Sequence, residues 1–299
     1  MADTTVIETV DLHKSYGSVE ALRGLNLQVP QGSICGFLGR NGAGKTTTIK
    51  ILLGMARPSS GRVRVFGLAA DTKESSVEIR RRTGFVSDEK SLYDFMTVAE
   101  MVRFTASFFP TWRADLQQRY LAKFDLPGER DVKDLSRGMR TKLALLLALC
   151  RSPELLILDE PTSGLDPAMA EEVLKALIAH SAGEGASIFF SSHQIADVDQ
   201  IADHVAIIDR GRMVVAGGLD DVREGYRRVQ CVFDGEAPPA ALRSPGVVRV
   251  ERRGRALSVL SNAGVDNVVS EAKAMGAVSV DVTSVTLKEI FLEIVTVED

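Results

Sequence analysis

The chain has few of the residues that mark several large classes of protein. It holds three cysteines and one tryptophan among 299 residues. Three cysteines with no metal-binding spacing argue against a disulfide framework or a zinc site, and they predict reduced thiols. The net charge of −4 leaves no basic excess, so nucleic acid is not expected as the main partner. No internal repeat or low-complexity tract interrupts the sequence.

Long apolar runs are also missing. The longest apolar stretch, Leu143–Cys150, is far shorter than the roughly 18 residues that a membrane-spanning helix needs. Residues 1–5 have neither a basic start nor an apolar segment, so no signal peptide is expected. We therefore expect a soluble chain whose access to a membrane depends on another protein. With 45% hydrophobic residues, the chain can bury one large core and a smaller one.

What the chain does contain is a complete GxxxxGK[ST] phosphate loop. The loop is formed by Gly39, Arg40, Asn41, Gly42, Ala43, Gly44, Lys45 and Thr46, and Thr47 follows it. An apolar run at 33–38 precedes it and a helical segment at 46–53 follows, which is the context expected for such a loop. Its N–H groups are predicted to bind phosphate, with Lys45 on the β- and γ-phosphates and the Thr46 hydroxyl on Mg²⁺. The alternative for this motif alone is a glycine-rich turn with a solvent-exposed lysine.

Two carboxylates, Asp159 and Glu160, follow the apolar run 155–158. Acids at the end of a buried strand cost free energy unless they face a site. Asp159 is predicted to hold Mg²⁺ and Glu160 to polarise an attacking water. Taken alone, the pair could equally cap a strand at the surface. His193 also follows an apolar run, and a lone histidine there is more often a turn residue than a catalytic one.

A third segment, Leu-Ser-Arg-Gly-Met at 135–139, separates classes of phosphate-loop protein. With the phosphate loop, the two carboxylates, the loop Ser163–Asp166 and His193, it resembles the signature of ATP-binding-cassette (ABC) ATPases over about residues 4–225. The resemblance implies ATP hydrolysis, with Glu160, His193 and Lys45 as catalytic residues. It also implies that further residues bind nucleotide within or between two chains, namely Tyr16, Ser136, Gly138 and Asp166.

Two positions depart from the pattern of that family. The usual signature is Leu-Ser-Gly-Gly-Gln, and here Arg137 and Met139 occupy its third and fifth positions. Where the family has a metal-contacting glutamine after the strand Gly84–Val86, the alignment places Asp88. An aspartate can bind Mg²⁺ but adds negative charge beside the γ-phosphate. Asp88 is therefore a predicted metal ligand, and Glu89 is the other candidate for the glutamine's role.

The resemblance also implies partners and a location. One phosphate loop and one signature per chain imply a homodimer, or a heterodimer with another ABC ATPase, with ATP and Mg²⁺ as cofactors. An integral membrane permease subunit is expected as partner, with no nucleic acid, and the chain is expected in the cytoplasm, peripheral at the cytoplasmic face of the cell membrane. The ending Leu287–Leu292 resembles subunits paired with ABC-2-type exporter permeases, which favours export.

Two other classes of function are alternatives to a transporter ATPase. A non-transport ABC ATPase acting on nucleic acid or translation would normally carry two cassettes or a long coiled-coil insertion, and neither is seen in this sequence. A regulatory module that holds ATP without turnover is disfavoured because Glu160 and His193 are both present.

The expected fold is α/β: a phosphate-loop NTPase core of ABC type with a helical subdomain, followed by a small α+β domain. The predicted domains are 1–225, with the helical subdomain at about 91–150, and 226–299. Apolar spacing predicts helices at 97–108, 113–124 and 137–150. Four side chains near the start of this subdomain could contact a membrane partner or fill the subdomain core: Tyr93, Phe95, Met96 and Phe104. Arg80–Arg82 is interpreted as a solvated helix face.

Overall fold

The computed structural model describes residues 5–239 and 242–295. Contacts divide the chain into two compact units, Met1–Ala216 and Gly217–Asp299, and each has its own hydrophobic core. The sequence predicts a domain boundary near residue 226, after α8 (Leu219–Gly225). The contacts place the boundary before this helix and group α8 with the second unit. Residues 1–4, part of the segment from which no signal peptide is expected, lie outside the described residues.

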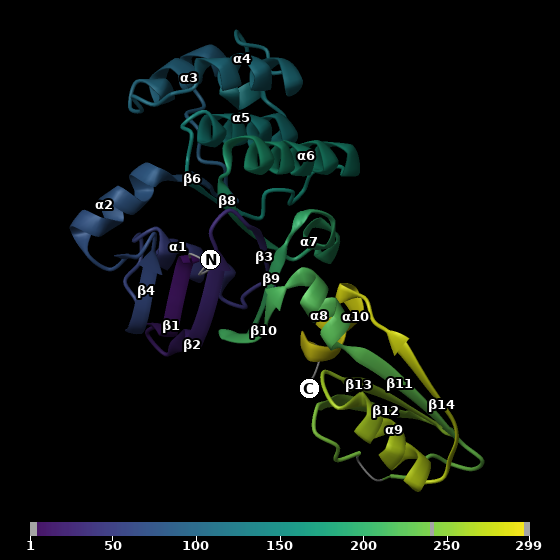
Figure 1. The fold of residues 1–299 in the computed structure, drawn as a ribbon. Helices are drawn as coiled ribbons and strands as arrows, with labels where there is room; N and C mark the ends of the chain where they lie inside the picture. Colours follow the sequence, from purple (N-terminus) through teal and green to yellow (C-terminus); the bar gives the residue numbers. More distant parts are fainter. Residues whose placement is uncertain (1–4, 240–241, 296–299) are drawn as a thin grey trace. The chain divides into compact units, whose positions relative to one another are not determined.

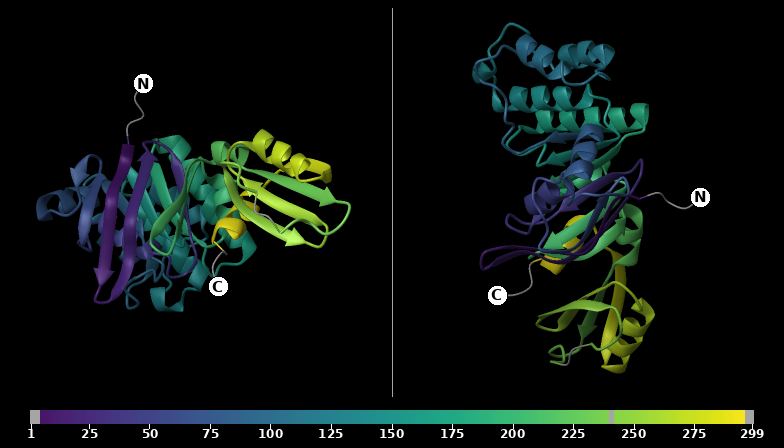
Figure 2. Two further views of the ribbon diagram at one scale, coloured as in Figure 1. Left: turned by 90° about the horizontal axis from the view of Figure 1, so that it is seen from below. Right: turned by 90° about the vertical axis from the view of Figure 1, so that its left-hand side faces the viewer.

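The first unit begins with a four-stranded antiparallel sheet of order β2-β1-β4-β5. Its strands are β1 (Thr5–Tyr16), β2 (Val19–Pro30), β4 (Ser60–Val65) and β5 (Leu68–Ala69). Figure 2 shows β1 and β2 as long paired strands. Buried positions alternate along β2 from Leu25 to Val29, as expected for a sheet with one face on the core.

The centre of the first unit is a six-stranded sheet of order β10-β9-β3-β8-β7-β6. Its strands are β3 (Ile34–Leu38), β6 (Thr83–Val86), β7 (Leu155–Asp159), β8 (Ser187–Ser192), β9 (His204–Asp209) and β10 (Arg212–Gly218). The pairs β3–β8, β3–β9, β7–β8 and β6–β7 are parallel. Every residue of β3, β7 and β8 is buried. Because these strands are parallel, their carboxyl ends meet at one edge of the sheet.

Helices flank this sheet and extend beyond it. They are α1 (Lys45–Leu52), α2 (Lys73–Arg82), α3 (Val98–Ala106), α4 (Ala114–Lys123), a short 3₁₀ turn (Val132–Asp134), α5 (Arg137–Leu149), α6 (Pro167–Glu184) and α7 (Ile195–Ile201). In Figure 1, α3, α4 and α5 gather on the side of the unit away from β1 and β2, and α5 packs against β6, α3, α4 and α6. Thr97 and Glu100 form a reciprocal capping box that fixes the start of α3.

The second unit is an antiparallel sheet of order β12-β13-β11-β14, with α8 and two further helices among its described residues. Its remaining elements are β11 (Arg227–Phe233), β12 (Val247–Arg253), β13 (Ala256–Ser261), α9 (Val265–Ala274), β14 (Ala277–Ser284) and α10 (Leu287–Val295). Helix α9 lies across the sheet and contacts β11 and β14 (Figures 1 and 2). Val229, Leu257, Val259 and Val268 are among the residues that form its core.

The predicted α/β fold is confirmed, including the three helices between residues 91 and 150. Two of the three arginines interpreted as a solvated helix face also make tertiary contacts. The Arg80 guanidinium donates to the Leu53 carbonyl at 2.9 Å, and Arg82 forms a paired contact with Glu154 at 2.6 and 2.7 Å. Within residues 5–239 and 242–295, no helix combines the length and apolar character needed to cross a membrane.

Candidate functional site

The phosphate loop connects β3 to α1 in the first unit. Gly42 and Gly44 have φ of 81° and 112°, a region that other residues rarely adopt. Gly39 is required for a different reason, because a Cβ there would lie 2.6 Å from the Ile208 carbonyl oxygen of β9. The Lys45 side chain is buried, and its Nζ donates to the Gly39 carbonyl at 2.7 Å. These constraints close the loop into a compact turn at the N-terminus of α1, where backbone N–H groups favour anions.

A hydroxyl–carboxylate pair joins α1 to the end of β7. The Thr46 Oγ1 donates to Asp159 Oδ2 at 2.8 Å, and the Ser191 hydroxyl of β8 donates to Asp159 Oδ1 at 2.6 Å. Ser191 also accepts the Glu160 N–H at 3.0 Å. Thr46 and Asp159 thus bring two hard oxygen donors together, as the sequence predicts for a Mg²⁺ site. Ser191 orients the aspartate from the neighbouring strand.

The Glu160 carboxylate lies between two nitrogen groups. Its Oε1 is 3.1 Å from Lys45 Nζ, and its Oε2 is 2.7 Å from His193 Nδ1. The His193 backbone N–H also donates to Oε2 at 3.3 Å. Glu160 is 9% exposed, so its charge is held by these contacts more than by water. The three residues predicted to be catalytic are therefore adjacent, although nearly 150 positions separate Lys45 from His193 in the chain.

The loop after β6 brings a buried cation to the same carboxylate residue. The Lys90 side chain is 7% exposed, and its Nζ lies 3.3 Å from the Glu160 carbonyl oxygen and 3.8 Å from Asp88 Oδ1. Burial lowers the pKa of the Lys90 ammonium, and the nearby Asp88 carboxylate opposes that shift. Asp88 itself is about half exposed and, with Glu89, lines a cavity of about 420 Å³ at the start of α5. The metal-binding role of Asp88 stays a prediction.

The signature segment forms the start of α5. The Ser136 hydroxyl accepts the Met139 N–H at 3.2 Å, so Ser136 is the N-cap of this helix. Gly138 is buried against Met169 of α6, and a Cβ there would lie 2.3 Å from its sulfur. Arg137 crosses to the loop after β7, with its Nη2 3.5 Å from Ser163 Oγ. A Cβ on Gly164 would lie 2.3 Å from the Arg137 guanidinium, so the unusual arginine packs on that glycine.

Two further predicted site residues have local structural roles. Asp166 caps α6, because its carboxylate accepts the Met169 N–H at 3.0 Å. Tyr16 ends β1 with its ring 49% exposed and the Lys14 ammonium 4.7 Å from the ring centre. An exposed ring at a strand end can stack on a planar ligand. Roles in nucleotide binding for both residues stay predictions.

Sequence reasoning missed three polar groups in and around the site, of which Ser191 and Lys90 contact Asp159 or Glu160. Ser191 follows two apolar residues at the end of β8, and that polar residue at a buried strand end was the available signal. Asp197 is buried and accepts hydrogen bonds from Thr162 and Ser192. Burial raises the pKa of the Asp197 carboxyl, and those hydroxyl donors oppose the shift. Lys90 gave no signal in sequence, because its contact with Glu160 depends on how the loop folds back.

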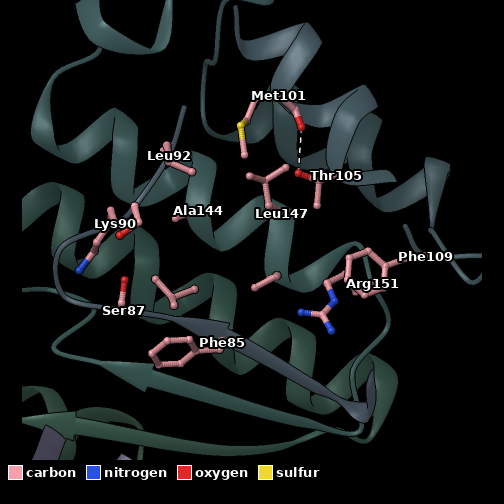
Figure 3. A pocket seen from close by; sticks show the side chains of 13 residues that line it. Phe85, Ser87, Lys90, Leu92, Met101, Thr105, Phe109, Ala144, Leu147 and Arg151 are labelled. Carbon is pink, nitrogen blue, oxygen red and sulfur yellow. Dashed lines mark hydrogen bonds between the residues drawn. The ribbon is translucent and has the colours of Figure 1, made fainter. Parts of the chain in front are cut away.

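A groove of about 410 Å³, lined by both apolar and polar side chains, opens beside Lys90, between β6 and the helices α3 and α5. Figure 3 shows Phe85, Met101 and Leu147 around it. At one end the Arg151 guanidinium lies 3.9 Å from the centre of the Phe109 ring. Near α3, Tyr93, Phe95 and Phe104 are exposed, and Tyr93 contacts both of the other two rings. The alternative that these rings fill the subdomain core is wrong for these three side chains.

Comparison with known proteins gives a consistent result. Residues 22–163 match the family described as ABC transporter. The bacitracin transport ATP-binding protein BcrA of Bacillus licheniformis is 37% identical over 227 residues, covering 75% of this chain and 74% of that protein. The Nod factor export ATP-binding protein I of Cupriavidus metallidurans is 32% identical over 265 residues, covering 85% and 86%.

A solved structure shows the same architecture. The ATP-binding subunit of an ABC transporter superposes with a TM-score of 0.66 at 30% sequence identity, covering 74% of this chain and 92% of that chain. The fold, the order of the motifs and the sequence identity agree on one family. The chain therefore belongs to the ABC transporter family, among its ATP-binding ATPase subunits.

Proposed function

We propose that this chain hydrolyses ATP as one half of a dimer that drives a separate membrane permease, and that the transport is export. The relative named for Nod factor export supports this direction. The resemblance of the Leu287–Leu292 ending to exporter subunits points the same way. The substrate would be selected by the permease.

One observation carries the catalytic part of the proposal. The Glu160 carboxylate is buried between the Lys45 ammonium at 3.1 Å and the His193 ring at 2.7 Å. A carboxylate fixed at the end of a strand beside a phosphate loop suits a base that orients and polarises water. His193 would hold the carboxylate in place, and Lys45 would contact the β- and γ-phosphates.

Magnesium would be held by Thr46 and Asp159. The fit rests on two hard oxygens that already lie 2.8 Å apart, one neutral and one anionic, which are the donors that Mg²⁺ prefers. The ion, when bound, supplies positive charge that offsets the negative charge of the phosphates. Asp88 is a further proposed ligand.

Dimerisation would complete each nucleotide site. Ser136 and Gly138 stand at the N-terminus of α5, where the hydroxyl and backbone N–H groups can bind phosphate oxygens. Each chain supplies one phosphate loop and one such segment, so two chains in head-to-tail order would form two sites. Asp166 would lie in the shared site, and Tyr16 would stack on the adenine. A second copy or another ABC ATPase can supply the other half.

The permease would dock on the first unit, near the groove of Figure 3 and the exposed Tyr93, Phe95 and Phe104 side chains. Exposed aromatic side chains are common in protein interfaces. We assign ATP hydrolysis to residues 1–225 and leave 226–299 as a small appended domain. Docking would hold the chain at the cytoplasmic face of the cell membrane.

Steady-state ATP hydrolysis by the full chain tests the catalytic part. Glu160→Gln should lower kcat by about 10²–10⁴-fold, because that is the usual contribution of a general base. The exposed Glu129→Gln serves as a matched control and should hydrolyse ATP at the wild-type rate. Turnover by Glu160→Gln within a few-fold of wild type would contradict the assignment.

The same variant tests the dimer. Glu160→Gln with MgATP should elute as a dimer in size-exclusion chromatography and mainly as a monomer without nucleotide. Adding Ser136→Ala should weaken the dimer, because it removes a hydroxyl from the shared site. A strict monomer under these conditions would reject the homodimer in favour of pairing with another ABC ATPase.

A further inference from the structure

The main chain of Glu160 adopts a conformation that needs outside support. Its φ is 50°, in the left-handed region that residues other than glycine seldom occupy. Such a conformation persists when surrounding contacts hold it, and it often marks a functional position. This backbone geometry sets the direction in which the Glu160 side chain leaves the main chain, and the contacts with Lys45 and His193 hold its carboxylate.

Contacts hold the Glu160 peptide groups on both sides. Its N–H donates to Ser191 Oγ at 3.0 Å. Its carbonyl oxygen accepts the Ser163 N–H at 3.2 Å and the Lys90 ammonium at 3.3 Å. Ser163 follows in the same turn, so Lys90 is the contact that ties this carbonyl to a different segment of the chain. Lys90 therefore joins the loop after β6 to the residue predicted to act as the base.

Placing a lysine beside the Glu160 carbonyl costs free energy. Its side chain is 7% exposed, and a buried ammonium costs free energy unless it is paired. Asp88, at 3.8 Å, is the carboxylate that forms an ion pair with it. Lys90 itself has a φ of 46°, so its own backbone is also in the left-handed region. A neutral side chain would fill this space without the cost of burying a charge, which argues that the cationic donor has a use.

We propose that Lys90 is a positioning residue for ATP hydrolysis: its ammonium fixes the Glu160 carbonyl and thereby the direction of the catalytic carboxylate. The inference rests on the proposed role of Glu160 and adds a residue that acts through it. The Lys90 stem also lines the groove of Figure 3, with its amine end directed away from Leu147 and Arg151. A shift of the loop 87–92 would thus move a contact of Glu160.

The first test compares Lys90→Met with Lys90→Arg in the full chain. Lys90→Met keeps the length and the apolar stem but has no donor. Its kcat should fall about 10–100-fold, as for small displacements of a catalytic group, while KM for ATP stays within about twofold. Lys90→Arg retains a charged donor and should recover most of the rate. The exposed Lys123→Met is the matched control and should behave as wild type.

The second test does not depend on turnover. Hydrogen–deuterium exchange over residues 159–166 should be faster in Lys90→Met than in wild type, because the turn that bonds the Ser163 N–H to the Glu160 carbonyl loses its outside anchor. Exchange in Lys90→Arg should match wild type.

The outcomes separate the two proposals. Wild-type kcat in Lys90→Met, or equal losses of kcat and of ATP affinity in both Lys90 variants, would overturn the positioning role. Unchanged exchange over 159–166 in Lys90→Met would overturn it as well. A wild-type chain that does not hydrolyse ATP would reject the proposed function instead, and the exchange comparison would still decide whether Lys90 holds Glu160.

Discussion

The two units of this chain treat charged side chains differently. In the first unit, several charged groups are buried, most of them at or beside the ends of parallel strands. In the second, they lie on a partly exposed antiparallel sheet. All the buried lysines, aspartates and glutamates among residues 5–239 and 242–295 belong to the first unit: Lys45, Lys90, Lys142, Asp159, Glu160 and Asp197. The second unit keeps Arg228, Arg249 and Glu293 partly exposed in a small network of ion pairs.

The difference indicates where selection for function outweighs stability. A buried ion pair is seldom more stable than an apolar group of the same volume, so its presence calls for another reason. Lys45, Glu160 and Asp159 have such a reason at a nucleotide site. The network of the second unit keeps partial contact with water, so burying its charges costs less free energy. Changes in the core of the second unit should therefore affect stability, and changes at the buried charges should affect activity.

Leu257→Ala should produce the largest change in stability without a change in activity. Leu257 is 2% exposed in the core of the second unit, and losing a buried leucine side chain costs about 2–5 kcal/mol. Denaturant unfolding, followed by hydrogen exchange over 256–261, should show a weakened second unit. The ATPase rate at 25 °C should stay within about twofold of wild type. Leu292→Ala, at a residue 48% exposed, is the matched control. A proportional loss of ATPase activity would contradict the separation of roles.

Lys45→Met should do the reverse and reduce ATP binding with little effect on folding. Removing a charged donor to phosphate costs about 1.5–3 kcal/mol, or about 10–100-fold in Kd. Titration with a fluorescent ATP analogue measures this loss. Lys273→Met, an exposed lysine of α9 in the second unit, should bind as wild type. An unchanged Kd in Lys45→Met would mean that Lys45 serves only its contacts with Gly39 and Glu160.

The sequence predicted most of the first unit because its patterns are local. Apolar runs of strand length ended in polar residues, and the glycine loop had the spacing of a nucleotide site. The strand 155–158, the two acids and the histidine after the next strand could be expected to meet, since parallel strands place their carboxyl ends at one edge. The structure brings Lys45, Glu160 and His193 together as this reasoning requires.

What the sequence did not reveal depends on how loops fold back. Lys90 reaches Glu160 across 70 positions through a loop with a left-handed residue, and no periodic pattern encodes that. Arg80 and Arg82 were interpreted as solvated because a run of like charges usually is. Their partners, the Leu53 carbonyl and Glu154, lie on other elements and become neighbours only through packing. Tertiary contacts of long cationic side chains were thus the least predictable feature.

Asp88→Gln should have the smallest effect and refines the comparison within the first unit. Asp88 is a half-exposed carboxylate beside a buried cation, 3.8 Å from Lys90 Nζ. If it binds Mg²⁺ directly, the glutamine variant should need more Mg²⁺ for half-maximal ATPase activity, with an unchanged ATP dependence at saturating metal. The expected size is about 1 kcal/mol, the Coulomb energy of charges a few ångströms apart in a partly wet site. Glu89→Gln in the same loop is the matched variant.

If Glu89→Gln shifts the Mg²⁺ profile and Asp88→Gln does not, Glu89 is the residue that contacts the metal and Asp88 serves as the partner of Lys90. If neither shifts it, the metal site consists of Thr46 and Asp159 without this loop, and the charge of Asp88 acts only through Lys90 on Glu160.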